Sequence, residues 1–181
     1  MTQRELRLHL SAGETLPISL SWIVEDGFLW LSAWNEEDST TTLGIWGPGD
    51  LVIPSIFSDR HIQLCSLSAV QVEERAVSVE EHQAFVNDQA LQLASLLQIS
   101  RIKQAEERLF RYLIWLGQRF GRVNSQGVGL SFTDMNLTHR NLAAMTGMSR
   151  VTVTKALIRF RQEERLCKQG NDELLRLNSL K

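Results

Sequence analysis

The chain has 181 residues, 43% hydrophobic and 22% charged, a composition typical of a soluble globular protein with one large domain or two small ones. The N-terminus lacks the basic and then apolar pattern of a secretory signal, and no apolar run approaches the roughly 20 residues that cross a bilayer, so we expect a cytoplasmic protein without a membrane partner. The net charge of −2 hides an asymmetry: residues 1–84 carry four basic and thirteen acidic residues, whereas residues 85–181 carry fifteen basic and eight acidic ones, which suggests a polyanionic partner for the C-terminal part.

Residues 5–80 combine short apolar or alternating runs with frequent turn signals, the pattern of many short β-strands. The clearest strands are Ile18–Val24, Phe28–Trp34 and Val70–Val72. The turn signals are Ala12-Gly13-Glu14, Glu25-Asp26-Gly27, Asn35-Glu36-Glu37-Asp38 and Gly47-Pro48-Gly49-Asp50. This spacing predicts a sandwich, roll or barrel, whose interior we expect to contain Trp22, Trp30, Trp34 and Trp46.

From about Val79 to about Arg119 the pattern is that of one long helix, without Pro or Gly between Ser78 and Leu116. Residues at the three- and four-residue steps of a coiled-coil seam are Ala90, Leu93, Leu97, Ser100 and Gln104. A second apolar line beside it consists of Leu91, Ala94, Ile102 and Leu109. Two apolar stripes indicate two partners, so we expect the β domain on one stripe and the same helix of a second subunit on the other. A single wide stripe packed inside a monomer is the alternative.

The glycine-rich and polar stretch Gly117–Gly129 predicts a loop, and the short strand Leu130–Phe132 follows it. The next segment has the pattern of a helix-turn-helix. Thr138 can cap a helix over His139–Met145, and Ser149 can cap a second helix that ends at Phe160. The residues expected to shape the turn and the core between the helices are Ala143, Gly147, Val153 and Ala156.

The second of these helices presents a polar face, followed by a predicted hairpin that would form a wing over residues 163–177. Its outward residues are Arg150, Val151, Thr152, Thr154, Lys155 and Arg159. Arg150 and Lys155, near the start of the helix, are suited to guanine edges or phosphates in the major groove. Residues 138–169 carry seven basic residues against two acidic ones. The pattern favours a winged helix-turn-helix that binds double-stranded DNA, with a helical hairpin bearing a solvated basic face as the alternative.

These residues resemble the signature of the cyclic-AMP receptor / fumarate-nitrate regulator (CRP/FNR) family. The matching segments are Leu137-Thr138, Leu142-Ala143, Gly147-Met148-Ser149-Arg150 and Thr152-Val153-Thr154-Lys155. More loosely, the turns of residues 12–14 and 47–51 resemble those of the family's effector-binding β-roll. The resemblance implies an α+β fold with a double-stranded β-roll of the cyclic-nucleotide-binding type over residues 1–84, a dimerisation helix over 85–120 and a winged helix-turn-helix over 121–181.

The same resemblance implies a homodimeric transcription regulator that binds a pseudo-palindromic operator and contacts RNA polymerase. The DNA-binding residues would be Thr138, His139, Arg140, Ser149, Arg150, Val151, Thr152, Thr154, Lys155 and Arg159. Val151 stands where the best-known members carry Glu. Because Glu accepts a hydrogen bond from cytosine, whereas Val touches a thymine methyl or excludes a base, we expect a different operator at that position.

The effector site departs further from the family. In the shortened loop of residues 52–61 the Gly-Glu that binds ribose is missing, and Arg60 is a weak candidate for the phosphate-binding Arg. We therefore expect no response to cyclic nucleotides, since a cyclic phosphate needs charge-assisted partners. The effector is unknown: a small organic acid such as 2-oxoglutarate, or no ligand at all, both remain open.

Two cysteines, Cys65 and Cys167, are too few for an iron–sulfur cluster or a four-cysteine metal site within one chain, and we expect neither a metal nor a cofactor. Residues such as His61 and Cys65 could ligate haem, but ordinary side chains explain them as well. Two rival functions remain. A cupin-like enzyme would require metal-binding histidines, which His9, His61, His82 and His139 do not form by spacing. The other rival is an interaction protein with a degenerate helix-turn-helix.

Overall fold

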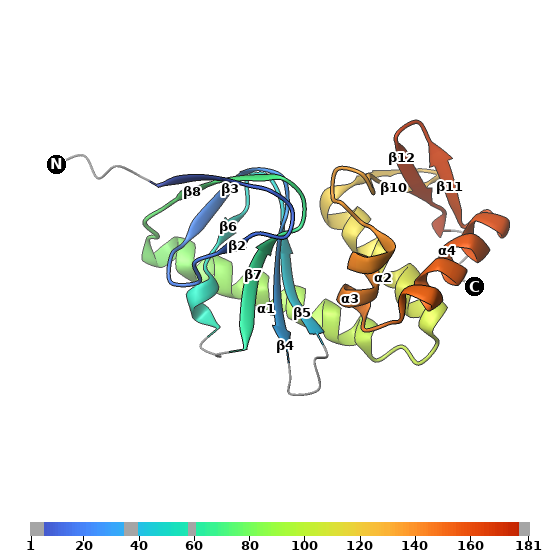
Figure 1. Ribbon diagram of the computed structural model, residues 1–181, viewed down its shortest axis with the longest axis horizontal. Coiled ribbons are helices and arrows are strands. Elements are labelled where there is room, and N and C mark those ends of the chain that lie inside the picture. Colours follow the sequence, from blue (N-terminus) through green and yellow to red (C-terminus); the bar gives the residue numbers. More distant parts are fainter. Residues whose placement is uncertain (1–5, 35–39, 58–60, 178–181) are drawn as a thin grey trace. The chain divides into compact units, whose positions relative to one another are not determined.

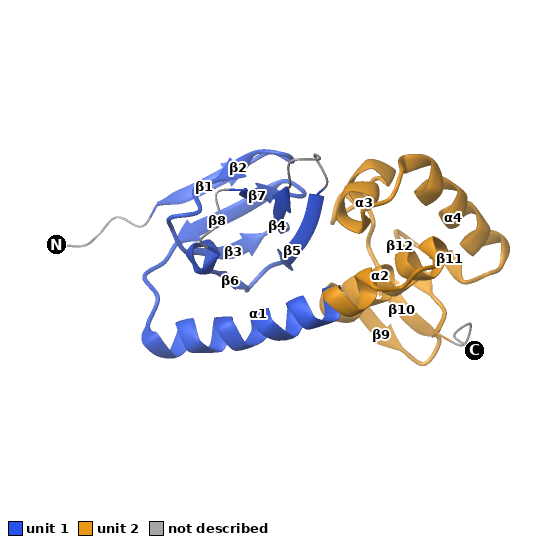
Figure 2. Cartoon of the chain, turned by 90° about the horizontal axis from the view of Figure 1, so that it is seen from below, with its two compact units in different colours: residues 1–96 blue, residues 97–181 orange. Residues whose placement is uncertain are grey.

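The computed structural model describes residues 6–34, 40–57 and 61–177. The chain forms two compact units, residues 1–96 and 97–181, coloured separately in Figure 2. The division falls inside a helix, whereas the sequence pattern suggests boundaries at residues 84 and 120. Most of this helix therefore belongs to the same compact unit as the N-terminal strands.

Unit 1 contains two antiparallel four-stranded sheets (Figure 1). The first sheet has the order β1 (Arg7–Leu10), β8 (Val70–Glu74), β3 (Trp22–Asp26) and β6 (Leu51–Val52). The second has the order β2 (Thr15–Leu16), β7 (Ile62–Ser66), β4 (Leu29–Trp34) and β5 (Thr40–Trp46). A 3₁₀ helix, η1 (Pro54–Ile56), follows β6. The predicted β domain is thus confirmed, and the predicted turn signal Asn35–Asp38 lies outside the described residues.

Alternation along the strands places apolar side chains between the sheets. The core includes Trp22, Leu29, Leu31, Leu64 and Val72, all nearly inaccessible to solvent. The turn at Gly27 is also as predicted: its φ is +79°, and an added Cβ would lie 2.0 Å from the Ala69 carbonyl oxygen, so only glycine fits.

The expectation that four tryptophans fill this interior is only partly correct. Trp22 and Trp46 are buried, whereas Trp30 is half-buried and Trp34 is 39% exposed. Trp30 and Trp34 lie on the opposite face of β4 from the buried Leu29 and Leu31, because successive side chains of a strand alternate between its faces, and Trp34 is the last residue of β4. The register shift between β4 and β5 leaves its extra residue, Leu43, on β5, so the alternation along β4 is unbroken.

Helix α1 (Val79–Ser100) begins with a capping box. The backbone N–H of Ser78 donates to Glu81 Oε2 at 3.0 Å, and the N–H of Glu81 donates to Ser78 Oγ at 3.2 Å. One residue per turn is then buried against the sheets: Phe85, Gln89, Gln92 and Leu96. The Phe85 ring stacks on Trp46, with 6.1 Å between their centroids.

The single long helix predicted over residues 79–119 is wrong, because the structure divides it into α1 and α2 (Ala105–Phe120). Local side-chain hydrogen bonds accompany the break. Ser100 Oγ donates to the Leu97 carbonyl at 2.7 Å, and Arg108 Nη1 donates to the Ile102 carbonyl at 2.9 Å. These bonds supply partners outside the helical ladder, so a helix can end without Pro or Gly.

Unit 2 packs three helices on a small sheet (Figure 1). The helices are α2, α3 (His139–Thr146) and α4 (Arg150–Gln162). The sheet has the order β11 (Leu166–Gln169), β12 (Asp172–Leu175), β10 (Gly127–Leu130) and β9 (Arg122–Asn124). None of the helices in the described parts of the chain is long and apolar enough to cross a membrane.

The predicted loop Gly117–Gly129 is also wrong, because it contains the end of α2 and the β9–β10 hairpin. Asn124 Oδ1 accepts hydrogen bonds from the backbone N–H groups of Gln126 and Gly127, which closes the turn. Strand β10 ends at Leu130, so the predicted strand over 130–132 is displaced toward the N-terminus. The main partner of β10 is β12, more than 40 residues away in the sequence, and local composition does not reveal such a pairing.

Candidate nucleic-acid interface

The turn between α3 and α4 has the predicted geometry. The N–H of Asn141 donates to Thr138 Oγ1 at 3.1 Å, and the N–H of Thr152 donates to Ser149 Oγ at 3.1 Å, so both predicted caps are present. Gly147 ends α3 in the left-handed conformation, with φ 65° and ψ 32°. The strongest part of the sequence pattern therefore corresponds to a formed helix-turn-helix.

One side of α4 is anchored in the core of unit 2. Its buried residues are Val153, Ala156, Leu157 and Phe160, which confirms the predicted inward positions of the first two. The rings of Phe160 and Phe110 of α2 meet edge to face at 5.2 Å between centroids. The Arg165 guanidinium lies 3.9 Å from the Phe110 ring centroid and donates to Glu107 at 3.1 Å. These contacts hold α4 firmly, so its opposite face is presented in a defined orientation.

Several short polar side chains of the predicted interface have their hydroxyls engaged within the protein. Ser149 Oγ and Thr152 Oγ1 share a hydrogen bond of 2.9 Å at the start of α4. Thr154 Oγ1 donates to the Arg150 carbonyl at 2.9 Å and lies 2.8 Å from His139 Nδ1. Because the single hydroxyl proton goes to the carbonyl, Thr154 accepts from His139, and this bond joins the start of α3 to α4.

The basic residues of this region divide into paired and unpaired groups. Arg159 donates to Glu163 at 2.7 Å and to Glu106 at 3.0 Å, and these carboxylates raise its pKa. Arg161 pairs with Glu173, and Arg165 with Glu107. Within the described residues no ion pair involves Arg140, Arg150, Lys155 and Lys168.

The uncompensated positive charge is therefore smaller than the sequence count indicates. It includes the predicted contacts Arg140, Arg150 and Lys155, whereas two carboxylates balance the charge of Arg159. Lys168, exposed on β11 close to the wing turn, is a candidate phosphate contact that the predicted site leaves out. The sequence signal for it was a lysine two residues before the predicted wing turn Gly170-Asn171.

The predicted dimer seam lies on α1 apart from one residue. Ala90 and Ser100 are exposed, Leu93 is half-buried and Leu97 is 63% exposed. The exposed Val86 extends this line by one turn toward the N-terminus and lies outside the predicted seam. Gln104 lies in the segment between α1 and α2, so its assignment to the seam of one continuous helix is wrong.

The second apolar line of the sequence analysis does not form the contact with the β domain. Leu91 is 70% exposed, and Leu109 belongs to α2 in the core of unit 2. The helix face buried against the sheets instead includes Gln89 and Gln92. Because two of its four residues are polar, a search for apolar periodicity overlooks this face.

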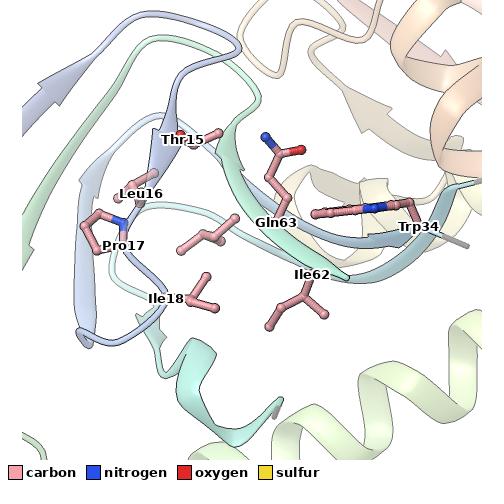
Figure 3. A pocket seen from close by; sticks show the side chains of 8 residues that line it. Thr15, Leu16, Pro17, Ile18, Trp34, Ile62 and Gln63 are labelled. Carbon is pink, nitrogen blue, oxygen red and sulfur yellow. The ribbon is translucent and has the colours of Figure 1, made fainter. Parts of the chain in front are cut away.

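The predicted effector loop is described only in part, and Arg60, the weak candidate, lies outside the described residues. Val52, Ile53 and Pro54 before it are buried. A surface groove of about 540 Å³ lies nearby in unit 1, with Thr15, Leu16, Pro17 and Ile18 on one side and Trp34 on the other (Figure 3). The remaining lining residues are Ile62, Gln63 and Leu64, and none of these eight described residues is charged.

The two cysteines lie in different units of the chain. Both are half-buried and free, and burial raises the pKa of the Cys65 thiol above its ordinary value. Among the described residues, no group of three or more His, Cys, Asp or Glu side chains is arranged to hold a metal ion.

Comparison with known proteins agrees with this geometry. Residues 107–181 match the model of the Crp-like helix-turn-helix domain. The chain is 35% identical over 158 residues to the regulatory protein CysR of Synechococcus elongatus, with 86% of this chain and 75% of CysR covered.

Solved structures show the same fold. FixK2 from Bradyrhizobium japonicum superposes with a TM-score of 0.74 at 15% identity, over 98% of this chain and 95% of its own. A CRP/FNR-family transcriptional regulator from Thermus thermophilus superposes with a TM-score of 0.66 at 20% identity, over 94% and 93%. The fold, the helix-turn-helix and the likeness to CysR together establish that the chain belongs to the CRP/FNR family of transcription regulators.

Proposed function

We propose that this regulator acts in the cytoplasm as a homodimer on a pseudo-palindromic operator, and that the first turns of α4 enter the major groove. The observation that carries the proposal is the exposed start of α4, where Arg150 and Lys155 have no ion-pair partner among the described residues. Guanidinium and ammonium groups in that position suit guanine O6 and N7 or phosphate oxygens. As the family resemblance implies, we also propose that the bound dimer contacts RNA polymerase.

The remaining predicted residues would position the protein on the DNA backbone. Thr138, His139 and Arg140 form the N-terminus of α3, where backbone N–H groups and the helix dipole favour a phosphate. Ser149, Thr152 and Thr154 would support this surface mainly by holding the start of α4, because their hydroxyls are bonded within the domain. Arg159 would be at most a weak phosphate contact, since two carboxylates already balance its charge.

Dimerisation through α1 is the second part of the proposal. Exposed or half-buried apolar residues recur at four- and three-residue steps on one side of the helix: Val86, Ala90, Leu93 and Leu97. This spacing suits a partner helix of the same sequence. A two-fold dimer would in turn require two half-sites in the operator, one for each α4.

The third part concerns the effector. We propose that cyclic nucleotides do not regulate this protein, because the sequence lacks the Gly-Glu that would hold ribose and offers only Arg60 for the phosphate. A cyclic phosphate without charge-assisted partners binds poorly.

The test is a binding-site selection from random duplex DNA with the full chain, followed by titration of the selected operator. Arg150→Ala is expected to cost about 1–3 kcal/mol on that operator and to relax preference at one base pair per half-site. Arg159→Ala is the matched control. It should weaken binding to all DNA sequences by the same factor, and by less than Arg150→Ala weakens binding to the selected operator. Equal losses on selected and random DNA for Arg150→Ala would contradict base recognition, and failure to select any sequence would contradict the function.

A further inference from the structure

The start of α4 exposes an apolar side chain among charged ones. Val151 is the second residue of the helix and is 63% exposed. It lies one turn before Lys155, and the buried Val153 and Ala156 occupy the other side of the helix. A β-branched residue is a mediocre helix former, so helix stability does not account for valine at this exposed position.

Val151 differs in chemistry from the other side chains at the start of α4. The hydroxyls of Ser149, Thr152 and Thr154 are engaged in hydrogen bonds within the domain. In the first two turns of α4 the exposed side chains are those of Arg150, Val151 and Lys155, whereas Thr152 and Thr154 are half-buried. Of these three only Val151 is apolar, so it cannot form a hydrogen bond with any base.

Apolar surface is scarce in the major groove, where the thymine C5 methyl is the apolar group and the other base-edge groups are hydrogen-bond donors or acceptors. A valine placed against a donor or acceptor would remove its water without replacing the hydrogen bond, which is unfavourable. From the geometry of α4 we infer that each operator half-site carries a T·A pair whose thymine methyl packs against Val151. This inference rests on the proposed insertion of α4 into the major groove and specifies the DNA that it recognises.

The methyl group can be removed or added without changing base pairing. In the selected operator, each thymine is replaced in turn by deoxyuridine, symmetrically in both half-sites. At one position per half-site the wild-type chain should bind about fourfold more weakly for each methyl lost, or about 15-fold for both. With cytosine at that position, 5-methylcytosine should restore part of the affinity, because its methyl occupies the same place.

Variants assign the effect to Val151. Val151→Ser should bind the thymine and deoxyuridine operators within about twofold of each other, because a contact to the methyl no longer exists. Val151→Glu should shift preference at that pair from thymine toward cytosine, whose N4 amino group can donate to the carboxylate. Ile158→Ser is the matched control: Ile158 is 50% exposed on α4 but lies about two turns further along, so the deoxyuridine effect should persist.

Each other result overturns the inference. If the wild-type chain selects an operator but tolerates deoxyuridine at every position, no thymine methyl is recognised, while the proposed function stands. If the deoxyuridine penalty persists in Val151→Ser, another residue makes the contact. If the chain selects no sequence at all, the inference and the proposed function fall together.

Discussion

Gln92 Oε1 accepts a hydrogen bond from the backbone N–H of Ile45 at 2.7 Å, at a site closed to solvent. One turn earlier, Gln89 Nε2 donates to the Leu43 carbonyl at 2.7 Å. Strand β5 is the outer strand of its sheet, so these bonds supply partners for backbone groups that no neighbouring strand can reach. Both glutamines are buried, and α1 is therefore tied to the sheet by specific polar contacts as well as by the Phe85–Trp46 stack.

Gln92→Met should show how much the hydrogen bond between Gln92 and the Ile45 N–H stabilises the protein. Methionine fills a similar volume but leaves the Ile45 N–H buried without a partner, so the free energy of unfolding should fall by about 1–3 kcal/mol. Urea denaturation measures it, and Gln98→Met, at an exposed position of the same helix, is the control. Equal stability of the two variants would indicate that the Ile45 N–H finds another partner.

The capping box of α1 predicts a pH dependence of stability. The hydrogen bond from the Ser78 backbone N–H, followed by the Ser78 hydroxyl and the Arg75 charge, lowers the pKa of Glu81 below its ordinary value of 4.5. Because the folded-state pKa is lowered, the stabilisation is present above pH 4.5 and is lost as the pH falls through the folded-state value. Glu81→Gln should therefore be less stable than wild type near neutral pH, and the difference should shrink on acidification below the ordinary pKa. Chemical denaturation across this range checks it, and a difference that grows on acidification would contradict the assignment.

Dimerisation through α1 can be tested by introducing negative charges into the proposed seam. Leu93→Glu combined with Leu97→Glu should yield monomers in sedimentation experiments and weaken operator binding, because carboxylates would face each other across a two-fold seam. Leu91→Glu is the matched control, since Leu91 is exposed on another side of α1. An unchanged dimer mass for the double variant would place the interface elsewhere.

Cyclic AMP and cyclic GMP at millimolar concentration should leave the melting temperature, the tryptophan fluorescence and the operator affinity unchanged. A ligand present at about 100 times its dissociation constant would raise stability by about 2.7 kcal/mol, which a thermal melt detects readily. Saturable stabilisation by either nucleotide would contradict the proposal for the effector loop.

Much of the structure of the DNA-binding unit follows from short-range interactions and could be predicted from the sequence. The caps at Thr138 and Ser149, the left-handed Gly147 and the inward Val153 follow from bonds and steric limits within a few residues. Such interactions form between residues that are close in the sequence, so the sequence pattern alone predicts them. The same holds for the β-strands of unit 1, whose alternation and turns identify a β domain although not every side-chain orientation.

Contacts between distant segments decided the rest. Gln89 and Gln92 are buried because their side chains bond backbone groups on the outer edge of β5, and the pattern of the helix does not show where that edge lies. Arg159 is paired with Glu106, 53 residues away, so the count of basic residues overestimated the uncompensated positive charge of the interface. The β9–β10 hairpin forms where a loop was expected because β12 pairs with it. In each case the deciding partner is close in space and far in sequence, and only the folded chain brings the two within bonding distance.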